Sequence, residues 1–346
     1  MLPLSTSTAF PSLPAGLWVP SPPMEPQPPL PPLPYLRLRV ALRALEAARL
    51  PPFVGSLLRG AFGHAFRRTV CTVGPAQDCA GCRLRRECAY ARVFETPLGP
   101  GEAPSSLRGQ TTAPHPYVFE TSPVAGELAA GEELRFDLLL FGDAIGYQAR
   151  IVWAIERMAT VGLGVRRARF ALARVEAVGP SGRTPLFVEG GGSTRAPVRG
   201  LPLPVEPLPG DGRRVRLRFL TPLRLRKEGR LVPPRDPRDL IYQMARRLYE
   251  VAHVHTPDFV EWPFRPLLDA ASRLGGPEWD FRLVRLERFS ARQGGKLELD
   301  GHVGTAVLEG NLDPLAPLLR AAEVLHVGKA TVFGLGRFVL EAALRG

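Results

Sequence analysis

The feature that most constrains the fold is an order of sequence patterns that occurs twice along the chain. Strands are predicted where apolar residues alternate with polar ones, and helices where apolar residues recur every three to four positions. In the first half the predicted strands and helices are, in chain order, 35–43, Gly55–Val70, 117–120, 134–141, 147–161 and 169–178. In the second half they are 215–220, 239–253, 281–289, 302–308, 315–325 and 337–344. Both halves therefore follow the order strand, helix, strand, strand, helix, strand.

This repeated order predicts an α+β protein built from two tandem ferredoxin-like domains, each an antiparallel sheet with two helices on one face. A single larger α+β domain is the alternative. The first 34 residues hold 12 prolines and one charged residue, Glu25, which is too little apolar pattern to form a core. The predicted divisions are a Pro-rich disordered tail (1–34), a first ferredoxin-like domain (35–180) with a four-cysteine insertion (71–92), a linker (181–212) and a second ferredoxin-like domain (213–346) with a glycine-rich loop.

The length and composition suit a globular chain. With 346 residues, of which 45% are apolar, the chain is long enough for two hydrophobic cores. It has no run of about 18 uncharged apolar residues, and its first residues lack the basic and apolar regions of a secretory signal. We therefore expect a cytoplasmic protein with no membrane partner.

The charge is strongly basic and unevenly distributed. The chain has 45 Lys plus Arg against 33 Asp plus Glu, and only Lys227, Lys296 and Lys329 are lysines. A coding bias could explain the preference for arginine, but it does not explain the excess over acids. Residues 213–247 hold twelve basic and three acidic residues, and alternate arginines of the strand there share one face. This concentration favours RNA or DNA binding, with a solvated or subunit-facing basic surface as the alternative.

A glycine-rich loop joins the last predicted helix to the last predicted strand. Gly328 is placed to end the helix, where a positive φ is cheap only for glycine. Gly334 and Gly336 leave the backbone bare, so a phosphate or a base could approach it, with Lys329 and Arg337 beside it. A Gly-x-Gly loop alone is a weak signal; its place at the end of the second unit of a basic protein strengthens it.

Several segments together point to a known family. They are 58–64, 239–242, 289–293, 301–304, 325–329 and 334–337. In these segments the chain resembles the CRISPR-associated precursor-crRNA processing endoribonucleases of the repeat-associated mysterious protein (RAMP) superfamily. The resemblance implies a tandem ferredoxin-like fold that binds the CRISPR repeat hairpin and cuts once on its 3′ side. It also implies metal-independent chemistry, in which a 2′-hydroxyl attacks the adjacent phosphate and leaves a 2′,3′-cyclic phosphate.

The alternative function is a non-catalytic crRNA-binding RAMP subunit of a CRISPR effector complex. Both functions require RNA contacts, and other effector subunits are possible partners under either. The residues predicted to bind RNA are Arg214, Arg216, Arg218, Arg292, Gly328, Gly334, Gly336 and Arg337.

All four cysteines lie within 18 residues of one another, at Cys71, Cys79, Cys82 and Cys88. Disulfides are rare in the cytoplasm, and four soft ligands in so short a span suit a tetrahedral metal ion. We predict one structural zinc ion. Because only one close Cys-x-x-Cys pair is present, an iron–sulfur cluster and unligated thiols remain alternatives.

Cleavage by an internal 2′-hydroxyl needs a base, an acid and positive charge near the phosphate. His64 is the first candidate because it shares the polar face of its helix with Arg67 and Arg68. His326 is the second; it ends the last helix close to Lys329. Lys329 and Tyr35 are expected to assist by holding the phosphate. The remaining histidines, among them His115, His253, His255 and His302, have no supporting pattern.

Overall fold

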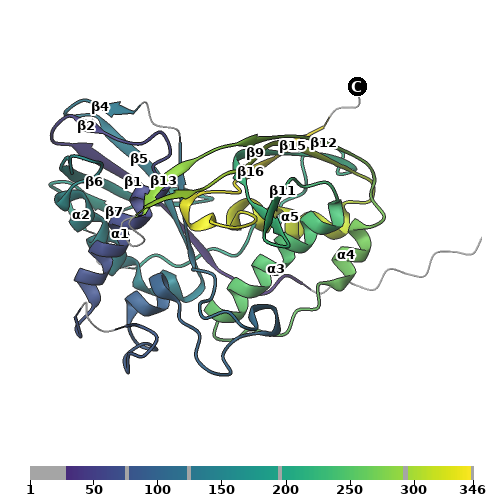
Figure 1. The fold of residues 1–346 in the computed structure, drawn as a ribbon, viewed down its shortest axis with the longest axis horizontal. Coiled ribbons are helices and arrows are strands. Elements are labelled where there is room, and N and C mark those ends of the chain that lie inside the picture. The colour runs from purple at the N-terminus through teal and green to yellow at the C-terminus, as the bar shows by residue number, and fades with distance from the viewer. Residues whose placement is uncertain (1–28, 75–77, 123–125, 194–196, 291–294, 344–346) are drawn as a thin grey trace, which may run out of the picture.

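A computed structural model describes residues 29–74, 78–122, 126–193, 197–290 and 295–343 of the protein. The chain forms two sheet-and-helix units. The first unit, purple to teal in Figure 1, lies at the left, and the second unit, green to yellow, lies at the right. The mixed α+β class predicted from the sequence is confirmed. No helix among the described residues is both long enough and apolar enough to cross a membrane.

The first unit contains one six-stranded antiparallel sheet in the order β3-β5-β1-β6-β7-β8. Along β1 the side chains of Leu36, Leu38, Val40 and Leu42 are buried against the helices, as their alternation predicts. Its elements are β1 (Tyr35–Ala44), α1 (Gly55–Val70), β3 (Tyr117–Thr121), β5 (Glu133–Phe141), α2 (Gln148–Val161), β6 (Phe170–Gly179), β7 (Gly182–Val188) and β8 (Gly192–Ser193), with the short pair β2 (Ala48–Arg49) and β4 (Glu127–Leu128) beside them.

The second unit contains a four-stranded antiparallel sheet in the order β12-β15-β9-β16. Its longest helix begins two residues before the predicted start at Asp239, because the Asp236 side chain caps it by accepting a hydrogen bond from the Arg238 backbone N–H at 2.9 Å. Its main elements are β9 (Arg214–Leu223), α3 (Pro237–His255), α4 (Arg265–Ala271), β12 (Gly275–Val284), β15 (Gly301–Glu309), α5 (Ala316–Leu325) and β16 (Phe338–Ala342). Two hairpins accompany them, β10 (Leu225–Lys227) with β11 (Arg230–Val232), and β13 (Glu287–Ser290) with β14 (Gly295–Glu298).

The two units share buried surface. On β3, Tyr117 and Phe119 face the core of the first unit, whereas Val118 packs into the core of the second. Leu139 and Phe141 of β5 also join the second core. Because these two strands are buried on both faces, the units pack directly against each other rather than being held by a linker alone.

The structure corrects three sequence predictions. Residues 29–34 are not a free tail, because Leu33 is 2% exposed and lies in the core of the second unit; residues 1–28 lie outside the described part of the chain. The predicted linker 181–212 contains β7, which pairs with β6 across the turn 180–181 and begins at Gly182, where φ is +115°. The strand predicted over 281–289 ends at Val284, and the chain enters the β13–β14 hairpin instead.

Candidate functional site

A cavity of about 430 Å³ lies where the two units meet. The first unit contributes Arg59 of α1 and parts of the segment 107–115, which leads into β3. The second unit contributes residues 243–250 of α3 and residues 328–333, the start of the glycine-rich loop. Ligand pockets typically enclose about 300–1,000 Å³. The cavity is therefore large enough for a ligand, and neither unit forms it alone.

The lining of this cavity is basic. Arg59, Arg246, Arg247 and Lys329 line it together with one carboxylate, Glu250. Arg246 is neutralised locally, because its Nε donates to Glu250 Oε1 at 2.7 Å. The excess positive charge suits an anionic ligand.

Arg247 is the most unusual of these cations because it is only 9% exposed. Its Nε donates to the Leu325 carbonyl oxygen at 2.7 Å, but within the described residues its Nη2 has no hydrogen-bond partner. Burial lowers the pKa of Arg247 to about 10, so the guanidinium is still charged at neutral pH. A buried donor without a partner is costly, and an anion in the cavity would supply the missing acceptor.

Two glycines of the glycine-rich loop are buried, and their places are filled by protein. A Cβ at Gly334, where φ is +85°, would lie 2.3 Å from the Phe119 carbonyl oxygen. At Gly336, where φ is +70°, it would lie 1.8 Å from the Val327 carbonyl oxygen. Both glycines thus allow other backbone segments to pack closely against them. The prediction that RNA could approach the bare backbone at Gly334 and Gly336 is therefore not supported by the structure. Gly328 and Lys329 do line the cavity.

His326 lies inside the interface with 0% exposure. Its Nε2 donates to Glu120 Oε1 of β3 at 3.0 Å, and its Nδ1 lies 3.2 Å from the Leu335 carbonyl oxygen. Burial lowers the pKa of His326, and the Glu120 carboxylate opposes that shift. The ring has no surface to present to an RNA phosphate, so the structure does not support the predicted proton donor at this position.

Arg337 joins the same cluster, since its Nη2 lies 3.2 Å from Glu120 Oε2. Arg37 of β1 also donates to Glu120, at 2.6 Å. Burial alone would raise the pKa of the Glu120 carboxyl, but His326 and Arg37 outweigh it and hold that pKa far below its ordinary value. Arg337 is thus paired with a carboxylate, and its side chain is still 30% exposed.

The helix before the glycine-rich loop ends differently from the prediction. Gly328 has the expected positive φ, +86°, but the helix already ends at Leu325, and His326 also has a positive φ, with φ +60° and ψ 169°, a region that is almost exclusive to glycine. Such a conformation costs about 1–3 kcal/mol unless its surroundings enforce it. The hydrogen bond from Nε2 to Glu120 holds His326 there, which ties the start of the loop to β3.

The other predicted catalytic residues lie elsewhere. His64 is exposed on α1 and is not among the residues lining the cavity. It lies five positions after Arg59, so the two side chains are about 140° apart around the helix axis. Tyr35 exchanges two backbone hydrogen bonds of 2.8 Å with Leu201 and packs against the second core.

His115, which has no supporting sequence pattern, does line the cavity. It is flanked by two prolines and follows neither a helical nor a strand period. Its neighbours at the cavity come from α1 and α3, far away in sequence, so only the fold brings them together.

The predicted RNA-binding arginines of β9 lie on the sheet face opposite the helices, because the residues between them, Val215 and Leu217, are buried in the core. Glutamates of the other strands of this sheet accompany them. Arg214 pairs with Glu278 and with Glu309, and Arg218 Nη2 lies 2.7 Å from Glu341 Oε1. The face therefore mixes charges more than the strand sequence alone indicates. Arg292 lies outside the described residues.

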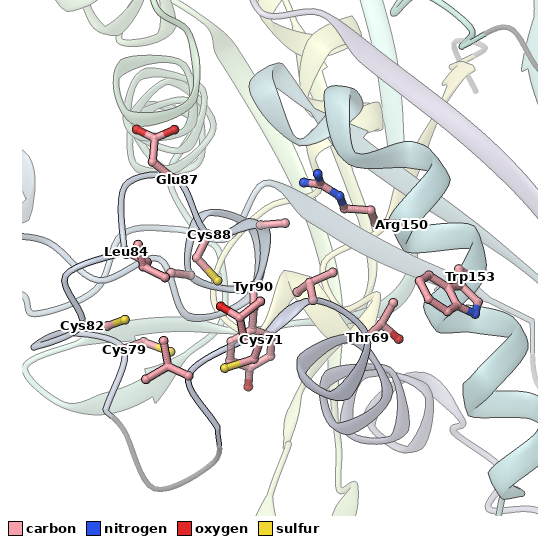
Figure 2. A pocket seen from close by; sticks show the side chains of 15 residues that line it. Thr69, Cys71, Cys79, Cys82, Leu84, Glu87, Cys88, Tyr90, Arg150 and Trp153 are labelled. Carbon is pink, nitrogen blue, oxygen red and sulfur yellow. The ribbon is translucent and has the colours of Figure 1, made fainter.

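The four cysteines line a second cavity, of about 340 Å³, between the end of α1 and the loop that follows it. Figure 2 shows their sulfur atoms turned toward a common space, with Glu87 directed away from it. Burial raises the pKa of the Cys79 thiol to about 11. Among the residues that the structure describes, no three His, Cys, Asp or Glu side chains are placed closely enough to hold a metal ion. The cysteines thus share one cavity, but metal geometry is not formed.

Comparisons with known proteins fit this arrangement. Residues 217–338 match the family model of the CRISPR-associated endoribonuclease Cas6, and residues 33–198 match a family model described as an N-terminal domain. An uncharacterized protein of Archaeoglobus fulgidus is 28% identical over 115 residues, which are 33% of this chain. The match spans 37% of that relative's length.

Two solved structures have similar folds. Cas6 in a product complex, a protein from Thermus thermophilus, has a TM-score of 0.50 and 19% identity and covers 89% of this chain and 99% of that one. A partial Cas6-RT-Cas1–Cas2 complex has a TM-score of 0.55 and 14% identity and covers 92% of this chain and 47% of that one. At these identities the structural matches support the fold alone. The family match of residues 217–338 confirms the resemblance to CRISPR-associated repeat-processing endoribonucleases.

Proposed function

We propose, from the match of residues 217–338 to the Cas6 endoribonucleases, that this protein binds the repeat RNA of a CRISPR transcript and cleaves it once to yield crRNA. The observation that carries the proposal is the basic cavity between the units. It combines the exposed Lys329 of the glycine-rich loop with the buried, partly unpartnered guanidinium of Arg247. A phosphodiester supplies the acceptors that this guanidinium lacks.

The proposed reaction needs no metal ion. The 2′-oxygen forms a bond to the adjacent phosphorus as the bond to the 5′-oxygen breaks, which gives a 2′,3′-cyclic phosphate and a 5′-hydroxyl. Negative charge develops on the phosphate oxygens, and fixed cations next to them lower the barrier. Arg247 and Lys329 are placed for this role. His326 and Tyr35 instead position the loop and the first strand, and His64 is kept as an alternative proton acceptor.

A second RNA contact is proposed on the open face of β9, which is the sheet face opposite the helices. Arg216 is the arginine on this face for which no ion pair is found among the described residues, and Arg218 is exposed beside Glu341. Phosphates that compete for these arginines would hold the RNA without reading its sequence.

The two units are proposed to be tandem ferredoxin-like domains, divided near residue 212. In support, four strands of the first sheet have the order β3-β5-β1-β6 and those of the second β12-β15-β9-β16. In both, the first strand of the unit lies between the third and the fourth, and all neighbours are antiparallel.

The cysteine cavity is proposed to bind one structural zinc ion after a small rearrangement of its loop. The support is that all four thiols line the cavity and none forms a disulfide. Elemental analysis of purified protein should find one zinc per chain, and Cys82→Ser should lose it and lower the melting temperature. Iron with sulfide would select the cluster, and protein without metal would contradict both.

The function is tested by incubating the full chain with repeat RNA in a metal chelator. One cut at a fixed position supports the enzyme. Intact but tightly bound RNA would instead identify a non-catalytic crRNA-binding subunit of an effector complex, provided that the melting temperature shows the chain still folded in the chelator. A cytoplasmic location belongs to either proposal.

A further inference from the structure

His115 occupies a place in the cavity that its sequence context does not explain. Its ring stacks on Tyr117, with 5.8 Å between ring centroids and 20° between planes, and on Phe94, with 6.4 Å and 19°. The guanidinium of Arg59 lies over the Phe94 ring, 4.1 Å from the ring centroid. The imidazole is therefore held in one orientation beside a cation.

The hydrogen bonds of Thr96 determine which nitrogen of His115 carries the proton. The Thr96 hydroxyl donates its one proton to the Ala113 carbonyl oxygen at 2.7 Å. The contact of 3.0 Å between Thr96 Oγ1 and His115 Nδ1 can then be a hydrogen bond only if Nδ1–H donates. A neutral ring with a proton on Nδ1 has a free electron pair on Nε2.

Nε2 is available for chemistry. Among the described residues, Nδ1 is the one nitrogen of this ring with a hydrogen bond. Nε2 has no hydrogen-bond partner there, but it does not belong to the fully buried polar atoms that lack a partner. His115 lines the cavity, whereas Thr96, which contacts the Nδ1 edge of the ring, does not, and we therefore place the opposite edge, with Nε2, toward the ligand space.

The backbone around Thr96 is also specialised. Thr96 ends a short π-helix, η1 (Ala91–Glu95), with φ +44°, which is rare for a β-branched residue. It is only 5% exposed, and its backbone N–H donates to the Ala91 carbonyl oxygen at 2.7 Å. Strained residues and π-helical turns concentrate at functional sites.

Resting on the function proposed above, we propose that His115 Nε2 is the general base that takes the proton of the attacking 2′-hydroxyl. The 2′-oxygen then bonds to phosphorus, the bond from phosphorus to the 5′-oxygen breaks, and the Lys329 ammonium gives a proton to that oxygen. Thr96 is a positioning residue, which selects the tautomer that has its electron pair toward the substrate.

The charges around His115 favour the neutral ring in the free protein. Burial, with Arg59 of α1 and with His255 and Arg247 of α3, lowers the pKa of His115 to about 3. Arg246, Glu250 and Lys329 line the same cavity. A bound phosphate offsets part of this positive charge, so it raises the proton affinity of the ring when the substrate is present.

Single-turnover cleavage at saturating protein separates this role from a structural one. His115→Asn keeps a donor for Thr96 but has no Nε2, and it should cleave about 10²- to 10⁴-fold more slowly with RNA affinity within a few-fold of wild type. Added imidazole should restore part of the rate to His115→Ala. Thr96→Val should slow cleavage without changing affinity, and the matched control Thr96→Ser, which keeps the hydroxyl, should cleave more nearly like wild type.

An RNA with sulfur in place of the bridging 5′-oxygen distinguishes a base from an acid, because its leaving group needs no proton. The defect of His115→Asn should persist on this RNA, whereas that of Lys329→Ala should shrink. The proposal would be overturned if His115→Asn recovered the wild-type cleavage rate on the sulfur-substituted RNA. It would also be overturned if His115→Asn cleaved normally while His64→Ala lost cleavage. Wild-type protein that cuts neither RNA would instead refute the proposed function itself.

Discussion

His326 Nε2 lies 3.0 Å from Glu120 Oε1, and this contact joins the end of α5 in the second unit to β3 in the first. The same carboxylate also holds Arg37 and Arg337. The glycine-rich loop starts at His326, so its conformation depends on the other unit. The candidate site is therefore assembled only when the two units are packed together.

Replacing Glu120 should weaken this packing strongly. Glu120→Gln leaves the partly buried Arg37 and Arg337 without their shared carboxylate. Breaking a fully buried pair costs about 3–5 kcal/mol, so we expect a loss of stability that approaches this range. Urea unfolding at pH 7 measures the change in the free energy of unfolding. Glu341→Gln, which removes the partly exposed partner of Arg218, is the control and should change stability little.

The same carboxyl predicts the direction of the pH dependence. The pKa of Glu120 is lowered in the folded protein, so its contribution to stability is present above the unfolded pKa of about 4.3 and is lost as the pH falls below that value. Wild-type protein should lose more stability between pH 5 and pH 3 than Glu120→Gln does. Parallel losses would show that Glu120 is not paired in this way.

The glycine-rich loop should tolerate no Cβ at Gly336. Gly336→Ala would place that atom 1.8 Å from the Val327 carbonyl oxygen at a φ of +70°, so we expect a lower melting temperature and weaker RNA binding. Gly60→Ala in α1 meets no atom within 4 Å and should stabilise the helix by about 0.5–1 kcal/mol. Equal melting temperatures for the two variants would contradict this packing.

The sequence predicted the regular elements well, because β1, α1 and α2 bury one periodic face each and that face can be read locally. It failed where a partner decides the structure. Part of the predicted linker forms β7 because it pairs with β6. Leu33, which was predicted to lie in a disordered tail, is buried because it packs into the second core.

The site was predictable only in part. The position of Lys329 follows from the glycine pattern, but the neighbours that distinguish His115 are remote in sequence. Thr96 precedes it by 19 residues, and Arg247 belongs to the other unit. His326 was predicted to be a proton donor because it ends a helix near Lys329. Sequence alone could not reveal that the ring is buried between the units, in contact with Glu120.

Arg59 should contribute to the low pKa of His115 in the free protein. Burial of the ring is the larger cause and the positive charge of Arg59 adds to it, so Arg59→Gln should raise that pKa above the wild-type value of about 3. NMR titration of the His115 ring measures it. Arg68→Gln, on an exposed position of α1, should leave the titration unchanged; an unchanged curve for Arg59→Gln would show that the two groups do not interact.

The arginines of β9 should hold RNA through phosphates. The triple variant with Arg214, Arg216 and Arg218 all changed to Ala should bind more weakly, and the slope of log affinity against log salt should flatten by about 0.7 per lost single-strand contact. Because Arg218 already pairs with Glu341, Arg216→Ala should account for more of the change than Arg218→Ala. A slope that stays the same in the triple variant would place RNA elsewhere.

The most direct test of the proposed reaction is the chemical identity of the RNA ends after cleavage in a metal chelator. Mass spectrometry of the products should find a 2′,3′-cyclic phosphate on one fragment and a 5′-hydroxyl on the other. A repeat RNA with a single 2′-deoxy sugar at the cut site should remain intact while binding as tightly as the all-ribose RNA. Cleavage of the deoxy-substituted RNA at the same position, or products with a 3′-hydroxyl and a 5′-phosphate, would contradict attack by the 2′-hydroxyl and with it the role given to the cavity.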